Sequence, residues 1–124
     1  MQEKLRLRTL VSVLSFCAMV EGASAHAHLQ RANPAPDSII ATAPQEVWIA
    51  FSEAVEPSMS AIEIVGAQGP IAAAGKAYVD QSAPATLVVK LSQPLPPGAY
   101  EARWRCVGPD SHAMRGSYHF EVRP

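Results

Sequence analysis

Residues 100–107, Tyr-Glu-Ala-Arg-Trp-Arg-Cys-Val, carry the clearest structural pattern in this chain. Successive side chains of a β-strand point to opposite faces, so an alternation of apolar and charged residues predicts a strand with one buried face. The apolar face consists of Tyr100, Ala102, Trp104 and Cys106, and the opposite face of Glu101, Arg103 and Arg105. We therefore expect Cys106 to be a buried, unreactive thiol.

Similar short patterns recur on both sides of this stretch. Eleven prolines, all after Ala25, interrupt the chain at close intervals and exclude long helices. The segment from Gly66 to Ser82 is rich in alanine and glycine, so we expect loops there with at most short strands. Short strands between frequent turns predict an all-β, antiparallel sandwich. The further predicted strands are residues 47–51, 62–64, 86–91 and 118–122.

The first 25 residues are typical of a secretory signal. A short basic stretch precedes an apolar run from Thr9 to Val20, and Ala23-Ser24-Ala25 supplies the small residues of a cleavage site. A membrane anchor is the alternative, but the run is shorter than the roughly 20 residues that span a bilayer. Lipidation of Cys17 is a second alternative, which the bulky Phe16 before it disfavours. We therefore predict a signal peptide at 1–25 and one domain at 26–124.

Composition narrows the classes of function for the processed chain. Residues 26–124 hold seven Lys and Arg against nine Asp and Glu, with no basic stripe that would suggest nucleic acid. No other segment is long and apolar enough to cross a membrane, so a soluble periplasmic protein is expected. Cys106 is the only cysteine after Ala25, which excludes an internal disulfide.

Cleavage after Ala25 would change the chemistry of His26. A free α-amine with a pKa near 8 would then stand beside an imidazole with a pKa near 6.5, and the two nitrogens could chelate one metal ion. Such a donor pair favours the tetragonal geometry of copper(II).

The second half of this site is predicted at Asp110-Ser111-His112, which follows the strand at 100–107 through Gly108-Pro109. At strand-like spacing, the carboxylate of Asp110 and the imidazole of His112 would lie on the same side of the chain. The plainer interpretation is an aspartate that caps a turn beside a solvated histidine.

Three interpretations of His28 stay open. In an extended chain it shares a face with His26 and could act as an auxiliary ligand. As the third residue of a processed chain, it could instead bind copper(II) together with the amine and two backbone amides. It could also be a plain exposed histidine.

The other polar candidates favour ordinary surface roles. His119 lies between Tyr118 and Phe120, which we place in the core, so His119 should face solvent. Glu53 and Glu56 are interpreted as solvated loop charges, because no nucleophile or acid/base partner accompanies them.

Taken together, these motifs resemble the CopC family of periplasmic copper-binding proteins. The resemblance spans nearly all of the chain after Ala25 and rests on these segments: 26–29, 34–38, 51–55, 95–100, 104–105, 110–112 and 116–120. It implies a seven-stranded Greek-key β-sandwich of the immunoglobulin or cupredoxin kind. It also implies one copper(II) ion per chain, bound by the terminal amine and ring of His26 with Asp110 and His112.

The same resemblance implies a role in copper resistance or uptake, often beside a CopD-type inner-membrane partner. Some members of the family have a second, copper(I) site in a methionine-rich loop, but only Met59 and Met114 follow Ala25 here. We therefore expect copper(II) alone.

We expect a non-enzymatic binder that sequesters copper and delivers it. An oxidative copper enzyme with an N-terminal histidine is the rival hypothesis, and it would need an open coordination position and a docking surface for substrate. A metal-free sandwich that acts as an interaction module is the third hypothesis.

Overall fold

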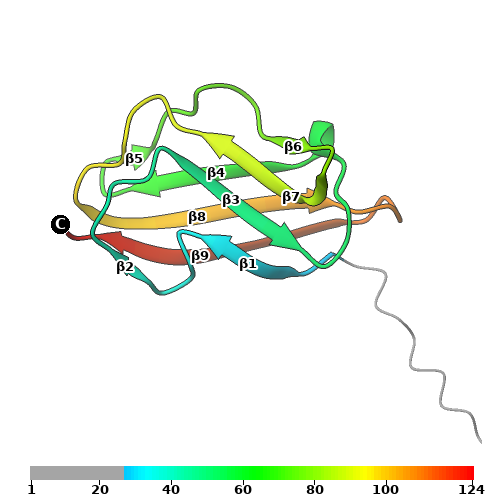
Figure 1. The fold of residues 1–124 in the computed structure, drawn as a ribbon, viewed down its shortest axis with the longest axis horizontal. Helices are drawn as coiled ribbons and strands as arrows, with labels where there is room; N and C mark the ends of the chain where they lie inside the picture. Colours follow the sequence, from blue (N-terminus) through cyan, green and yellow to red (C-terminus); the bar gives the residue numbers. More distant parts are fainter. Residues whose placement is uncertain (1–26) are drawn as a thin grey trace, which may run out of the picture.

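The computed structural model describes residues 27–124, which fold into two β-sheets packed face to face (Figure 1). One sheet has four strands in the order β1-β3-β7-β6, and the other has five in the order β2-β9-β8-β4-β5. The strands are β1 (Leu29–Asn33), β2 (Ile39–Ile40), β3 (Glu46–Phe51), β4 (Ala61–Gly66), β5 (Gly69–Pro70), β6 (Tyr78–Asp80), β7 (Ala83–Lys90), β8 (Gly98–Val107) and β9 (Ala113–Val122). A single 3-10 turn, η1 (Pro57–Met59), is the one helical element within residues 27–124.

The predicted all-β sandwich is confirmed, with two differences in its strands. The described residues form nine strands instead of seven, because β2 and β5 have two residues each and are too short to show an alternating pattern. The sheets are also not wholly antiparallel, since β2 runs parallel to the end of β9. Strands distant in sequence pair as in Greek-key folds, β3 with β7 and β4 with β8.

The core lies between the two sheets and follows the alternation in the sequence. Val47, Ile49 and Phe51 of β3 are buried, and so is Cys106 of β8, as predicted. Complete burial of an aliphatic or phenyl side chain stabilises a fold by about 1.5–3 kcal/mol, so these positions dominate its stability. The other large buried side chains include Ile64, Leu87, Leu95, Tyr118, Phe120 and Val122.

Trp104 is the exception on the apolar face of β8, because it is only half-buried. Its cross-strand partner on β9 is Gly116, which has no side chain to cover the indole. The ring of Trp104 instead lies against the backbone of Gly116 and meets Phe51 edge to face, with ring centroids 5.2 Å apart.

The topology brings three distant parts of the chain to one end of the sandwich. The start of β1, the end of β3 and the turn between β8 and β9 lie together there, and the C-terminus lies at the opposite end (Figure 1). Any site built at this end draws on residues near 27, near 53 and near 110.

Candidate metal centre

The turn between β8 and β9 holds Asp110 and His112 against each other. One carboxylate oxygen of Asp110, Oδ1, accepts the backbone N–H of His112 at 3.2 Å, and Oδ2 lies 3.2 Å from Nδ1 of the ring. The carboxylate is largely covered, with 22% of its side chain exposed, whereas the imidazole is 69% exposed. The two side chains are therefore in contact with each other.

The conformation that brings them together differs from the expected one. Ser111 has a φ of 65°, in the left-handed region, and its N–H donates to the carbonyl of Gly108. A side-chain-bearing residue in this region costs of order 1–3 kcal/mol. The Asp110–His112 contact therefore results from a tight turn and not from strand-like alternation. An aspartate that only caps a turn would make the same contact.

The base of this turn is tied to η1. The backbone N–H of Glu56 donates to the carbonyl of Val107 at 2.8 Å, and the N–H of Val107 donates to Oγ of Ser60 at 3.1 Å. Ser60 Oγ in turn donates to the carbonyl of Glu56 at 2.7 Å. These three bonds fix the last residue of β8 and give the Asp110 turn a rigid support.

The N-terminal part of the described chain lies beside the same turn. Ala27 is 1% exposed, and its Cβ lies 3.8 Å from the point that a Cβ on Gly108 would occupy. His26, the central residue of the predicted site, lies outside the described residues, as does the predicted signal peptide at 1–25. The neighbour to which His26 is bonded is thus packed against the turn that carries Asp110.

His28 is held by its backbone and turns its side chain outward. Its N–H donates to Oγ of Ser52 at 2.8 Å, and its carbonyl accepts the N–H of Ser52 at 2.7 Å. The residue is exposed, in alternation with the buried Ala27. These bonds hold the residues just before β1 against the residue that follows β3.

Glu53 is a residue of this site that the sequence interpretation missed. It is half-buried, and its Oε2 lies 4.0 Å from the point that a Cβ on Gly108 would occupy, while Oδ1 of Asp110 lies 3.5 Å from the same point. Two carboxylates therefore approach Gly108 together with Ala27. The pairing of β1 with β3 brings the residues after Phe51 beside Ala27, and no pattern in the sequence indicates that pairing.

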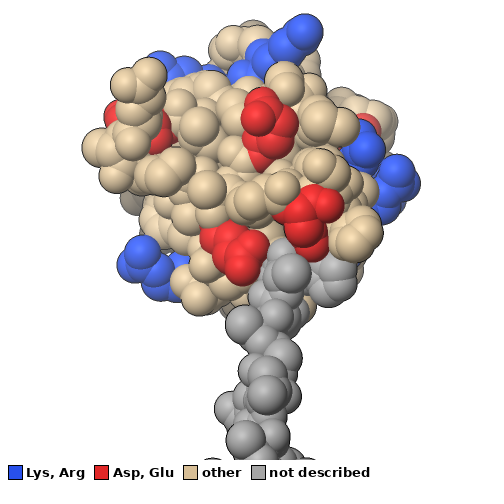
Figure 2. All heavy atoms as spheres, turned by 90° about the vertical axis from the view of Figure 1, so that its right-hand side faces the viewer, with Lys and Arg blue, Asp and Glu red and all other residues tan. Residues whose placement is uncertain are grey.

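Glu56 agrees with the sequence interpretation. It is exposed, and its carboxylate accepts hydrogen bonds from the N–H and the hydroxyl of Ser58 at the start of η1. Seen from this end, the molecule shows several acidic side chains close to one another (Figure 2). An end face of this charge attracts cations.

Within residues 27–124, no group of three or more His, Cys, Asp or Glu side chains is arranged to hold a metal ion. Asp110 and His112 supply one oxygen and one nitrogen donor, so a complete site needs donors from outside the described residues. A carboxylate and an imidazole suit copper(II) or zinc better than a soft ion such as copper(I).

His119 lies apart from this donor pair, whereas both methionines lie near its turn: Met59 lines a hollow with Gly108 and Ser111, and Met114 follows His112 by two residues. The side chain of His119 is 72% exposed on the outer face of β9, with Nε2 3.9 Å from Glu101 Oε2, so its predicted orientation toward solvent is confirmed. Met59 is exposed on η1, whereas Met114 packs against the core.

No helix in the described part of the chain is long and apolar enough to cross a membrane.

The model of the CopC domain matches residues 29–123. This chain belongs to the CopC family. Copper resistance protein C of Escherichia coli is 33% identical over 123 residues, covering 92% of this chain and 90% of that protein. Protein YobA of Escherichia coli K12 is 32% identical over 117 residues, covering 94% of each chain.

A solved CopC-family structure supports the same assignment. The crystal structure of CopC from Methylosinus trichosporium OB3b superposes with a TM-score of 0.73 at 29% identity, covering 80% of this chain and 95% of that one. The predicted family is thus confirmed, and with it a copper-related function for this chain.

Proposed function

We propose that this CopC-family chain loses residues 1–25 on export and then binds one copper(II) ion per chain in the periplasm. The α-amine and imidazole of His26, the carboxylate of Asp110 and the imidazole of His112 would be its ligands. The copper is cargo, which the protein sequesters and passes to a membrane partner of the CopD type.

The position of Ala27 is the observation that carries this proposal. Ala27 is buried beside Gly108, at the base of the turn that presents Asp110 and His112. Consecutive Cα atoms are 3.8 Å apart, so a residue bonded to Ala27 starts within one peptide of this turn. Cleavage after Ala25 would therefore create two nitrogen donors next to the two donors already held there.

The donor set fits copper(II) on chemical grounds. Three nitrogens and one carboxylate oxygen form the mixed nitrogen and oxygen set typical of tetragonal copper(II). Oδ2 of Asp110 and Nδ1 of His112 lie 3.2 Å apart, so both atoms would bind the same ion once copper replaces the contact between them. Glu53, close to the same point, would add negative charge near the ion.

We propose binding and transfer rather than catalysis. A substrate-oxidising copper site needs a docking surface, and Tyr78 on β6 is the one strongly exposed aromatic side chain among the described residues. His28 is assigned an auxiliary place near the amine of His26, because it faces away from the core one residue after Ala27. Copper(I) selects soft thioether ligands, and residues 27–124 contain only two methionines, Met59 and Met114, which favours copper(II).

Copper titration of point variants tests the ligand set. Asp110→Ala and His112→Ala should each weaken copper(II) binding by about 100-fold, since loss of even an outer-shell partner costs 10–100-fold. Both side chains lie on a surface turn, so the apo protein should unfold near the wild-type denaturant concentration. His119→Ala is the matched control and should bind like wild type.

The spectrum of the bound ion gives a second readout. Wild-type protein should give one tetragonal copper(II) EPR signal at one equivalent, and His112→Ala should lose nitrogen hyperfine structure. Unchanged affinity and spectrum in both site variants, or an equal loss in His119→Ala, would refute the proposed ligands.

A further inference from the structure

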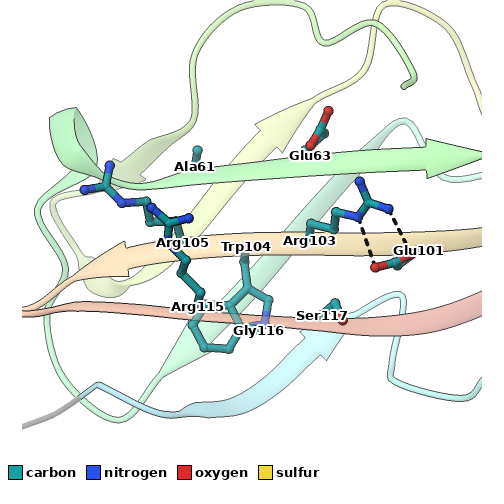
Figure 3. Close-up of a pocket in the computed structure, with 9 residues that line it drawn as sticks. All are labelled: Ala61, Glu63, Glu101, Arg103, Trp104, Arg105, Arg115, Gly116 and Ser117. Carbon is teal, nitrogen blue, oxygen red and sulfur yellow. Dashed lines mark hydrogen bonds and ion pairs between the residues drawn. The ribbon is translucent and has the colours of Figure 1, made fainter. Parts of the chain in front are cut away.

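The outer face of the five-stranded sheet carries a groove of about 510 Å³ that the copper proposal does not use (Figure 3). It crosses β4, β8 and β9. We call it the arginine groove. Its lining includes three arginines, two glutamates and the half-buried Trp104: Glu63, Glu101, Arg103, Trp104, Arg105 and Arg115.

Charge is unevenly distributed along this groove. At one end Arg103 is neutralised, because its Nε donates to Glu101 Oε1 at 3.0 Å and Glu63 lies opposite it on β4. These carboxylates raise the pKa of Arg103, and the hydrogen bond from Arg103 lowers the pKa of Glu101. This end of the groove is internally paired.

The other end holds two arginines that face each other. Arg105 and Arg115 are directly opposite on β8 and β9, and the neighbour of Arg105 on β4 is Ala61. Figure 3 shows both side chains at this end, apart from the Arg103–Glu101 pair. Neither has an ion pair within residues 27–124. Like charges directly opposite in a sheet are destabilising, so this pair favours an anion from outside.

Two further features of the groove indicate the kind of ligand that Arg105 and Arg115 would bind. Trp104 also lines the groove next to Gly116, although its ring extends from the core side of β8, opposite to the face that carries the arginines. The outer edge of β9 is covered by β2 only at Glu121 and Val122, so in the described structure residues 113–117 have no strand partner on that side. An open edge beside a cationic pair suits an extended, acidic polypeptide segment.

We propose that the arginine groove docks an extended acidic segment of a partner protein, with its carboxylates on Arg105 and Arg115. An anionic membrane fits less well, because the adjoining end face is acidic (Figure 2) and would be repelled by it. Arg105 and Arg115 lie two residues from the ends of the strands that enter the Asp110 turn. A partner bound to these arginines would lie beside the candidate copper site. The inference that this partner accepts copper rests on the proposed function.

NMR titration of 15N-labelled protein, expressed as the full chain and purified after processing, tests this docking surface. The probe is an acetylated, amidated nine-residue peptide of alternating aspartate and threonine, and its asparagine counterpart is the negative control. At low ionic strength the acidic peptide should shift the amides of Arg105 and Arg115 and the indole N–H of Trp104. Arg105→Gln/Arg115→Gln should weaken binding by about fivefold or more, as expected for two exposed ion pairs.

Arg123→Gln is the matched control, because Arg123 is an exposed arginine already paired with Glu121. It should bind the peptide like wild type. The single variants Arg105→Gln and Arg115→Gln provide the same test with smaller changes if the double variant unfolds.

Any of four results would overturn the proposal. The acidic peptide could fail to bind at millimolar concentration, or bind equally to wild type and the double variant. Phosphatidylglycerol vesicles could bind through the same arginines while the peptide does not, which would make the groove a lipid site. Concentration-dependent shifts without peptide, on the groove and the acidic end face, would indicate self-association.

Copper(II) titration separates this test from that of the proposed function. The double variant should keep wild-type copper affinity, because neither arginine lies in the candidate centre. Loss of copper binding in Asp110→Ala with unchanged peptide binding would support both assignments independently.

Discussion

Replacing Gly116 with alanine should destabilise the sandwich, although alanine is normally preferred to glycine within a strand by about 0.5–1 kcal/mol. A Cβ at this position would lie 2.4 Å from Cζ2 and 2.6 Å from Cε2 of Trp104. Carbon atoms in contact are about 3.5–4.0 Å apart, so the indole would have to retreat by about 1 Å or more.

The magnitude follows from what the indole loses. Forced displacement of a packed side chain costs about 1–3 kcal/mol. The edge-to-face contact between Trp104 and Phe51, at 5.2 Å, contributes about 0.5–1.5 kcal/mol more. After the intrinsic gain from alanine is subtracted, Gly116→Ala should lower the free energy of unfolding by about 1–3 kcal/mol.

Urea unfolding of a double-mutant cycle with Trp104→Leu isolates this clash. In the Trp104→Leu background, Gly116→Ala should be neutral or stabilise the fold by up to about 1 kcal/mol. The same cost in both backgrounds, or a stabilised single variant, would show that the indole does not occupy the space above Gly116.

The remaining predictions concern charge, the thiol and pH. The hydrogen bond from Arg103 lowers the pKa of Glu101 below its ordinary value of 4.5. The pair therefore stabilises the fold above pH 4.5, and this stabilisation is lost as the pH falls through the pKa of Glu101 in the folded protein. In Arg103→Gln, NMR titration should show the pKa of Glu101 rising toward 4.5, and an unchanged pKa would contradict this. Burial raises the pKa of the Cys106 thiol, so iodoacetamide should label it far more slowly in the folded protein than in urea, and equal rates would contradict its burial. Glu53→Gln should weaken copper(II) binding by about tenfold, whereas no change would remove Glu53 from the site. Isothermal titration should show copper affinity falling from pH 7 to pH 5 as the amine and imidazoles take up protons, and a flat profile would exclude them as ligands.

The core was predictable from the sequence because burial follows the two-residue period of strands. Val47, Ile49 and Phe51 alternate in sequence and are buried in the structure. The half-burial of Trp104 was not predictable from β8 alone, because it depends on the missing side chain of Gly116 on β9. Strands of two residues, such as β2, contain too few side chains to show any period.

The residues of the candidate site also differ in whether the sequence predicts them. Asp110 and His112 could be found because a single residue, Ser111, separates them and one turn positions both. Glu53 could not, because its proximity to Gly108 depends on β3 pairing with β1 and on the sheets packing together. Local spacing predicts donors within one turn, whereas donors from other segments require the tertiary fold.

Copper binding as proposed requires a free amine at His26, and copper(II) titration followed by EPR tests this requirement. The protein processed after Ala25 is compared with a form that carries one additional glycine before His26. We expect one tight tetragonal site in the processed protein, and at least about tenfold weaker binding with an altered spectrum in the extended form, because its His26 offers only a ring nitrogen. Equal affinity and identical spectra in the two forms would contradict the account.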